Sequence, residues 1–138
     1  MTTCKLSRRS LPFSTSTEPR LWWHRLPGSN YVPPIYASLA EGEWQLLQDW
    51  FEETSRQNLV GECVVPIMSL LHGLVMGSGI QRIVQLGTHA GYSALLLGFS
   101  LRQMHAQHGL FSFEIDEPLC HFARQWIERA GLSSVVQV

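Results

Sequence analysis

A short apolar segment runs into a glycine-flanked turn at residues 84–93, which read Val-Gln-Leu-Gly-Thr-His-Ala-Gly-Tyr-Ser. Gly87 allows the chain to bend sharply and its backbone to approach a ligand, and Gly91 allows a helix to start close to the strand. The free amides at the start of that helix can donate hydrogen bonds to a bound group. The pattern predicts a turn that holds a nucleotide-type cofactor, with an ordinary strand-to-helix turn as the alternative.

The spacing of the two glycines distinguishes between cofactors. A dinucleotide site uses Gly-x-Gly-x-x-Gly, in which the second glycine lets the backbone approach the pyrophosphate. Here the spacing is Gly-x-x-x-Gly, and His89 stands where a dinucleotide site has that glycine. A cofactor without a pyrophosphate, such as S-adenosylmethionine, suits this bulkier turn better. An NAD-type dehydrogenase is therefore the less favoured interpretation.

Acidic residues end the next apolar segment, which reads Phe-Glu-Ile-Asp at residues 113–116. In a doubly wound sheet the carboxyl ends of neighbouring strands meet at the edge where ligands bind. The carboxylate of Glu114 can accept hydrogen bonds from both hydroxyls of a ribose there, and a solvated charge at the strand end is the alternative. Asp116 is a second candidate, although it can equally cap the helix that follows.

The elements that must position these residues alternate between strand and helix. From residue 80 onward, the sequence predicts strands at 83–86, 110–115 and 135–138, and helices at 92–105 and 118–130. The first strand is short, β-branched and apolar, as expected of a strand buried on both faces of a parallel sheet. The order β-α-β-α-β implies right-handed crossovers and the α/β class, with a Rossmann-like, doubly wound parallel sheet.

Two helices are expected before the sheet. Ser38 and Glu41 match a capping box and predict a helix start near Ser38. The apolar stripe of this helix consists of Leu39, Trp44, Leu47, Trp50 and Phe51. A second helix is expected over residues 62–76, with Pro66 in its first turn. One broad apolar face of the second helix is expected to hold Val64, Ile67, Met68, Leu71, Leu74 and Val75.

The sequence is expected to divide into three segments. Residues 1–30 are expected to form a loosely packed or disordered tail, which is basic and rich in Ser and Thr. An organelle transit peptide has the same composition. Residues 31–79 form the helical segment, and residues 80–138 form the cofactor-binding half of a Rossmann-like domain. Trp22 and Trp23, in the tail, are expected to pack onto the sheet, with a substrate lip or a dimer contact as alternatives.

The composition of the 138 residues excludes several classes of protein. A formal net charge of −1 argues against a nucleic-acid partner. No apolar stretch approaches the roughly eighteen residues of a membrane span, so we expect a soluble protein with no membrane partner. Three cysteines without a Cys-x-x-Cys pair favour a reducing compartment, the cytoplasm, and argue against a structural zinc site. His105 and His108 lack acids or cysteines at ligand spacing, so no metal site is predicted.

The two cofactor motifs resemble a known family. The stretches LGTHAGYSALLL and FEIDEPLCHFARQWIERAGL are similar to the catechol- and caffeoyl-CoA-type O-methyltransferases, which are class I, S-adenosylmethionine-dependent enzymes. The resemblance covers residues 61–138 and implies that Gly87, His89, Tyr92 and Ser93 line the methionyl part of the cofactor, with Glu114 on the ribose. It also implies that residues 62–68 can contact the methionine end, and that a small-molecule hydroxyl accepts the methyl group.

The sequence departs from this family at two places. The family usually has Glu at the position of Gln85, and a neutral amide can still hydrogen-bond but adds no charge attraction for the ammonium group of the cofactor. In the family, the divalent metal, usually Mg²⁺, and the proposed lysine base are held by residues that follow the fourth strand. The sequence up to Val138 carries only the start of a third strand, so no catalytic residue is assigned.

The absence of a fourth strand from this sequence leads to an alternative function. In the family's strand order the segment 83–86 is central, so here it is expected to form a bare apolar edge. Such an edge favours a homo-oligomer, or a non-catalytic fragment or interaction module that pairs with another chain through the sheet.

Overall fold

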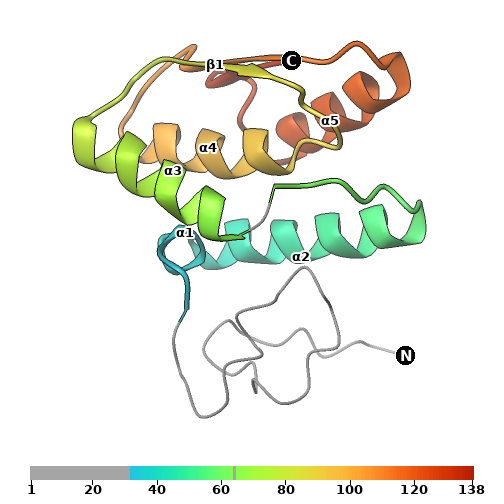
Figure 1. The fold of residues 1–138 in the computed structure, drawn as a ribbon, viewed down its shortest axis with the longest axis horizontal. Helices are drawn as coiled ribbons and strands as arrows, with labels where there is room; N and C mark the ends of the chain where they lie inside the picture. Colours follow the sequence, from blue (N-terminus) through green and yellow to red (C-terminus); the bar gives the residue numbers. More distant parts are fainter. Residues whose placement is uncertain (1–31, 64) are drawn as a thin grey trace.

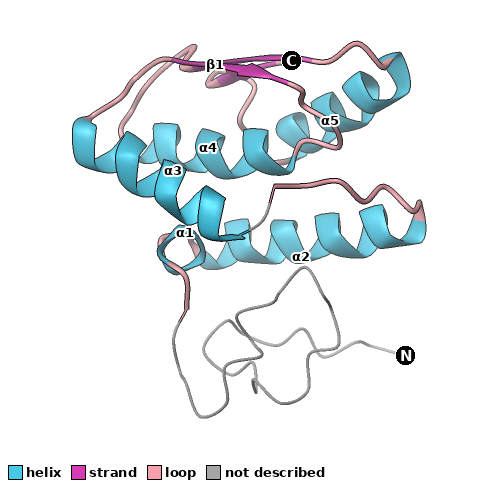
Figure 2. Cartoon of the chain, in the orientation of Figure 1, coloured by secondary structure: helices cyan, strands magenta, loops and turns pink. Residues whose placement is uncertain are grey.

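The protein is described here from a computed structural model, which describes residues 32–63 and 65–138. These ranges form five helices and three strands. Figure 1 shows their arrangement, and Figure 2 colours them by type. Their order is α1 (Pro34–Ala37), α2 (Glu41–Arg56), α3 (Val65–Ser78), β1 (Ile83–Leu86), α4 (Tyr92–Gln103), β2 (Leu110–Phe113), α5 (Glu117–Arg129) and β3 (Val136–Gln137). None of the helices in the described ranges has the length and apolar character needed to cross a membrane.

The three strands form one parallel sheet in the order β1-β2-β3. Ile83 pairs with Leu110 and Leu86 with Phe113, while Leu110 also pairs with Val136 on its other side. The predicted α/β class with a parallel sheet is therefore confirmed, and β1 has the predicted bounds. The second and third strands are shorter than predicted.

Every described helix lies on the same side of the sheet (Figures 1 and 2). Helices α3, α4 and α5 form the layer beneath the strands, and α1 and α2 lie beneath that layer. The prediction that the first strand is buried on both faces is wrong, because the side chains of Val84 and Leu86 are 69% and 83% exposed. Phe113, the partner of Leu86 in β2, is 57% exposed. The expectation of a bare apolar edge is confirmed within the described residues.

The first helices begin differently from the prediction. Residues 34–37 form the short helix α1. The sequence did not predict this helix, which begins directly after Pro33. The Ser38 hydroxyl donates to the Ile35 carbonyl at 3.0 Å and so ends α1 instead of starting α2. The N-cap of α2 lies two residues later, at Ala40, whose amide donates to the Glu43 carboxylate at 2.7 Å; the Ala40 methyl group cannot complete a capping box.

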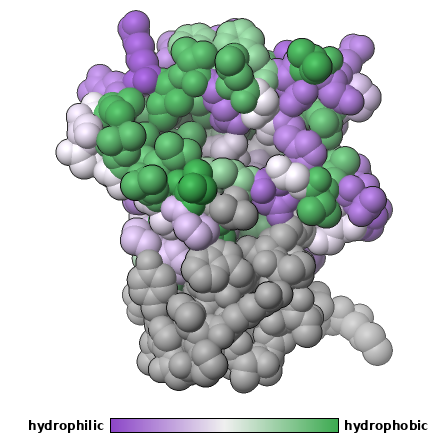
Figure 3. Space-filling view, in the orientation of Figure 1, coloured by the Kyte–Doolittle hydropathy of each residue, from purple (hydrophilic) through white to green (hydrophobic). Residues whose placement is uncertain are grey.

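The apolar stripe of α2 is confirmed, whereas the broad face predicted for α3 is only half right. Leu39, at the entrance of α2, and Trp44, Leu47, Trp50 and Phe51 within it are all buried. In α3, Met68 and Val75 are buried and Leu71 is half-buried, but Ile67 and Leu74 are exposed, and Val64 lies outside the described residues. Figure 3 shows hydrophobic side chains gathered on the face of the molecule over α3. A helix that is apolar on most of its circumference gives no periodic signal for which face is inside.

Close packing of α4 against the sheet depends on a glycine. A β-carbon on Gly98 would lie 2.7 Å from Val136 Cγ2 and 2.9 Å from Leu132 Cδ1, and both of these side chains are buried. Gly131, just after the end of α5, has a φ of 64°, in the left-handed region that suits a helix C-terminus. These contacts fix α4, and therefore the turn at its start, relative to the strands.

Candidate functional site

The predicted turn and the predicted acid lie side by side at one edge of the sheet. The Gly87 amide donates to the Phe113 carbonyl at 3.0 Å, so the end of β1 is bonded to the end of β2. One residue further along β2, the Glu114 carboxylate accepts the amide of His89 at 2.7 Å. The strand ends thus bring the glycine turn and the carboxylate into direct contact.

The turn itself has an unusual backbone. Gly87, His89 and Gly91 have φ values of 84°, 50° and 90°, all in the left-handed region. A β-carbon on Gly91 would also lie 3.2 Å from the β-carbon of Ala123 in α5, so this position needs glycine for two reasons. A β-carbon on Gly87 would meet nothing within 4 Å, so the space in front of this bend is open. Helix α4 begins at Tyr92, directly after the turn.

The Glu114 carboxylate is held by backbone amides. One oxygen, Oε1, accepts the amides of Ile115 and Asp116, while Oε2 accepts the amide of His89. Hydrogen bonds from the Asp116 and His89 amides lower the pKa of this carboxyl group below its usual value. A carboxylate oxygen has two acceptor positions, so Oε2 retains capacity for one more donor, such as a hydroxyl group.

Gln85 presents a buried acceptor at the same edge. Its Nε2 donates to the Gly87 carbonyl at 2.8 Å and to the Ser93 hydroxyl at 2.7 Å, so it joins β1 to the first turn of α4. Its Oε1 is buried and has no hydrogen-bond partner within the described residues. A buried carbonyl oxygen without a partner is unfavourable by about 1–3 kcal/mol, so this atom is suited to accept a hydrogen bond from a bound ammonium or amide group.

The two large side chains of the turn point in different directions. Tyr92 is buried, with its ring 5.5 Å from that of Trp50 and its hydroxyl 2.5 Å from the hydroxyl of Tyr36. Its ring therefore packs in the core against α1 and α2. The His89 ring lies against the loop before α3, because a β-carbon on Gly61 would be 3.2 Å from His89 Nε2. Gly61 directly precedes residues 62–68, which the family resemblance places at the methionine end of the cofactor.

Asp116 serves the helix that follows it. Its Oδ1 accepts the Leu119 amide at 3.0 Å, and it is the N-cap of α5. The capping interpretation is therefore confirmed. Its side chain remains exposed.

Sequence reasoning missed several residues that hold the turn in place. The hydroxyls of Thr88 and Ser112 are both buried and lie 2.5 Å apart, which links the turn to β2. From the other side, the indole nitrogen of Trp50 donates to the Ala90 carbonyl at 2.8 Å. Neither contact leaves a local signal in the sequence, because Thr88 and Ser112 are 24 positions apart and Trp50 and Ala90 are 40 positions apart.

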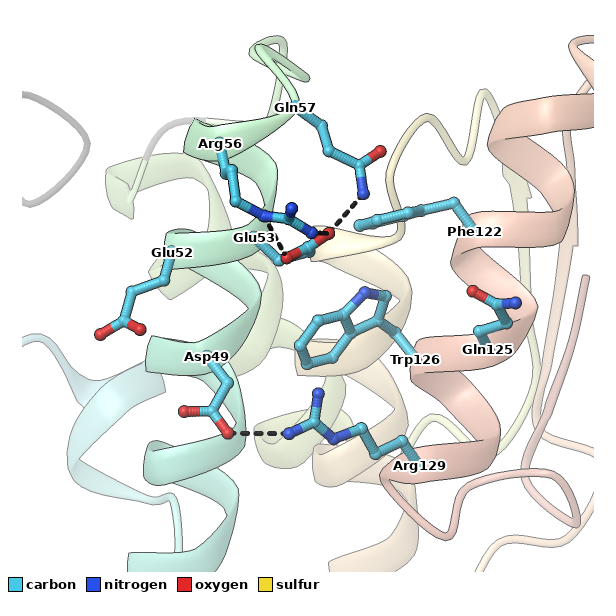
Figure 4. Close-up of a pocket in the computed structure, with 9 residues that line it drawn as sticks. All are labelled: Asp49, Glu52, Glu53, Arg56, Gln57, Phe122, Gln125, Trp126 and Arg129. Atoms are coloured by element: carbon cyan, nitrogen blue, oxygen red, sulfur yellow. Dashed lines mark hydrogen bonds and ion pairs between the residues drawn. The ribbon is translucent and has the colours of Figure 1, made fainter.

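A groove lies elsewhere, between α2 and α5, and holds none of the predicted residues (Figure 4). Its volume is about 510 Å³, and its walls carry the ion pairs Asp49–Arg129 at 2.9 Å and Glu53–Arg56 at 2.5 Å. The Asp49–Arg129 pair joins α2 to α5, and the Glu53–Arg56 pair lies along α2. A cavity of about 410 Å³ adjoins Glu114 and is lined by residues of β2, α5 and the chain end at β3, among them Phe113 and Arg124.

The chain is similar to solved structures of methyltransferases. No protein-family model and no curated protein matches it. Among solved structures, an O-methyltransferase from Bacillus cereus, crystallised in complex with SAH (S-adenosylhomocysteine), matches 68% of this chain with 30% identity and a TM-score of 0.58. An SAH-bound methyltransferase from Podospora anserina matches 92% of this chain with 19% identity and a TM-score of 0.57.

This chain shares the fold of the class I O-methyltransferases. The family resemblance seen in the sequence is thereby confirmed. The chain spans 42% of the length of the Bacillus cereus enzyme and 50% of that of the Podospora anserina enzyme. In this methyltransferase fold, the turn at residues 87–91 and the acid Glu114 lie together as the resemblance implied. No group of three or more His, Cys, Asp or Glu side chains that could hold a metal occurs among the described residues.

Proposed function

We propose that this chain supplies the S-adenosylmethionine-binding part of a methyltransferase that methylates the hydroxyl oxygen of a small molecule. The observation that carries the proposal is the contact between the His89 amide and the Glu114 carboxylate, which joins the glycine turn to the acid at one sheet edge. The methyltransferase from Bacillus cereus, with the same fold and 30% identity, was solved in complex with SAH, and this supports the choice of cofactor.

Three groups at this edge fit the parts of such a cofactor. Gln85 Oε1, buried and without a partner among the described residues, would accept a hydrogen bond from the ammonium group. Glu114 Oε2 would accept one from a ribose hydroxyl. The open space at Gly87 would admit the cofactor close to the backbone, where a side chain would stand in its way.

When bound, the cofactor supplies a methyl group on a positively charged sulfur, which is the electrophile. The contribution of this chain is to bind and orient it, which converts a reaction between two free molecules into one between held groups. A divalent metal that acidifies the acceptor hydroxyl would be held by residues of the fold that lie outside the part described here.

Isothermal titration of the 138-residue chain with S-adenosylhomocysteine tests the proposal. The matched variants are Glu114→Gln and Asp116→Asn, which make the same change from carboxylate to amide two residues apart. Hydrogen bonds to a charged group contribute about 1.5–3 kcal/mol, so Glu114→Gln should weaken binding roughly tenfold or more. Asp116→Asn should leave it unchanged because Asn is an equally good cap. A folded wild-type chain that gives no heat of binding would contradict the proposal.

A second candidate function is pairing with another chain through the sheet. The observation that favours it is the exposure of Val84, Leu86 and Phe113 beside the free edge of β1. Unpaired strand edges with apolar side chains readily pair with other strands. Light scattering after size-exclusion chromatography should show self-association that Leu86→Lys reduces. A wild-type chain that is monomeric at all concentrations would refute this candidate.

A further inference from the structure

The layer formed by α1 and α2 makes buried polar contacts with the cofactor turn, although some forty residues separate them in sequence. Trp50, in α2, is fully buried, and its indole Nε1 donates to the Ala90 carbonyl at 2.8 Å. The Trp50 ring also packs against that of Tyr92, with 5.5 Å between centroids. Tyr92 is bonded in turn through its hydroxyl to Tyr36 of α1. The N-terminal helices therefore contact the turn at Ala90, two residues before α4 begins, and contact α4 at its first residue, Tyr92.

The conformation of the turn depends on the hydrogen bond that the Ala90 carbonyl accepts. Ala90 is fully buried and stands between His89 and Gly91, whose φ values of 50° and 90° are both in the left-handed region. A buried carbonyl that loses its donor is destabilised by about 1–3 kcal/mol. The peptide unit that carries this carbonyl also carries the Gly91 amide, which donates to Thr88 at 3.0 Å. A rotation of this unit would therefore disturb the turn on both sides.

The sheet holds the same turn from the opposite direction. Glu114 accepts the His89 amide and Ser112 is bonded to the Thr88 hydroxyl, and both belong to the β2 end of the sheet. The contacts from β2 fix residues 88 and 89, and the contact from α2 fixes residue 90. The left-handed backbone of the turn is thus held between two layers of the protein.

We propose that Trp50 is a positioning residue for the cofactor turn, acting through its hydrogen bond to the Ala90 carbonyl. This inference rests on the proposed function. Without the indole donor, the turn would populate other conformations, so only a fraction of the molecules would have the turn that binds the cofactor. The apparent affinity for the cofactor would fall in proportion to that fraction. The α1–α2 layer is accordingly a part of the binding site that never touches the ligand.

Helix α2 offers a matched control for this proposal. Trp44 lies in the same helix and is equally buried, but its indole nitrogen has no hydrogen-bond partner within the described residues. Trp50→Phe and Trp44→Phe therefore remove the same group from the same core, and only the first removes a hydrogen bond to the turn. We expect Trp50→Phe to weaken S-adenosylhomocysteine binding about three- to tenfold, the equivalent of one hydrogen bond. Trp44→Phe should leave the affinity unchanged, although both lower the melting temperature.

An NMR titration of the wild-type chain distinguishes a positioning role of Trp50 from a purely structural one. In ¹H–¹⁵N spectra the indole N–H resonance of Trp50 should shift on addition of S-adenosylhomocysteine, because its acceptor belongs to the turn. The resonance of Trp44 should stay in place. This experiment does not depend on the folding of the Trp50→Phe variant, and the resonance missing from Trp44→Phe identifies Trp44.

The outcomes separate the two proposals. Unchanged affinity in Trp50→Phe, or a Trp50 resonance that does not respond to bound ligand, would overturn the positioning role while leaving the cofactor site intact. Absence of binding in both the wild type and Trp44→Phe would instead overturn the proposed function. Weaker binding in Trp50→Phe alone, with a responsive Trp50 resonance, supports both.

Discussion

Replacement of Gly98 by alanine brings two opposing effects of known size into competition. In the interior of a helix, alanine is more favourable than glycine by about 0.8–1 kcal/mol. At this position, however, the added carbon would lie 2.7 Å from Val136 Cγ2 and 2.9 Å from Leu132 Cδ1. Both neighbours are buried, and the β-branched Val136 is stiff within its strand. Overpacking of this kind costs about 1–3 kcal/mol.

The balance predicts that Gly98→Ala lowers the free energy of unfolding by about 1 kcal/mol. Gly73 in α3 is the matched control, because a β-carbon there would meet nothing within 4 Å. Gly73→Ala should therefore raise the free energy of unfolding by up to about 1 kcal/mol. The two variants make the same chemical change in the middle of two helices and should have opposite signs.

Thermal unfolding followed by circular dichroism measures both variants. For a domain of about a hundred residues, 1 kcal/mol corresponds to a shift of roughly 4 °C in melting temperature. We expect the melting temperature to fall by about this amount for Gly98→Ala and to rise by a similar amount for Gly73→Ala. If Gly98→Ala instead raised the melting temperature as much as Gly73→Ala, the close approach of α4 to Leu132 and Val136 would be refuted.

Three further predictions concern titration and capping. Burial lowers the pKa of His72, whose Nδ1 lies 2.8 Å from Ser100 Oγ. The contribution of the neutral ring to stability is therefore full above about pH 6.5 and is lost as the pH falls through the lowered pKa. Urea unfolding at pH 7.5 and 5.5 should show a loss in the free energy of unfolding that is smaller in His72→Gln. Glu114 also has a lowered pKa, so its contribution is present at neutral pH and disappears on acidification, and acid titration of Glu114→Gln should show a flatter decline in stability. Asp116→Ala removes the cap of α5 and should lower the free energy of unfolding by about 1 kcal/mol in denaturant titration, with unchanged affinity for S-adenosylhomocysteine.

The parallel sheet could be predicted from the sequence because its signals are local. The β-branched segment Ile83–Leu86 is followed by Gly87, and both bounds of β1 are as predicted. The cap of α5 at Asp116 and the left-handed Gly131 likewise follow from residue types at fixed offsets. These features depend on neighbours within a few positions.

Features that depend on packing over long distances could not be predicted in this way. The side of α3 that faces the core cannot be told from the sequence because the helix is apolar on most sides, and Ile67 and Leu74 of the predicted face are exposed. The start of α2 was placed too early because Ser38 had two possible roles, and the preceding helix α1 decides between them. Around the candidate site, the contact of Trp50 with Ala90 was beyond local reasoning, since any of several buried tryptophans could have filled that role.

The one-sided sheet has a consequence for how the folded state of this chain is recognised. Val84, Leu86 and Phe113 present an apolar surface to water even when every helix is in place. Dyes such as ANS, whose fluorescence is commonly taken to report a molten globule, would bind this surface in the native chain as well. Near-ultraviolet circular dichroism of the packed tryptophans, which depends on fixed side chains, is therefore the appropriate probe of native tertiary structure.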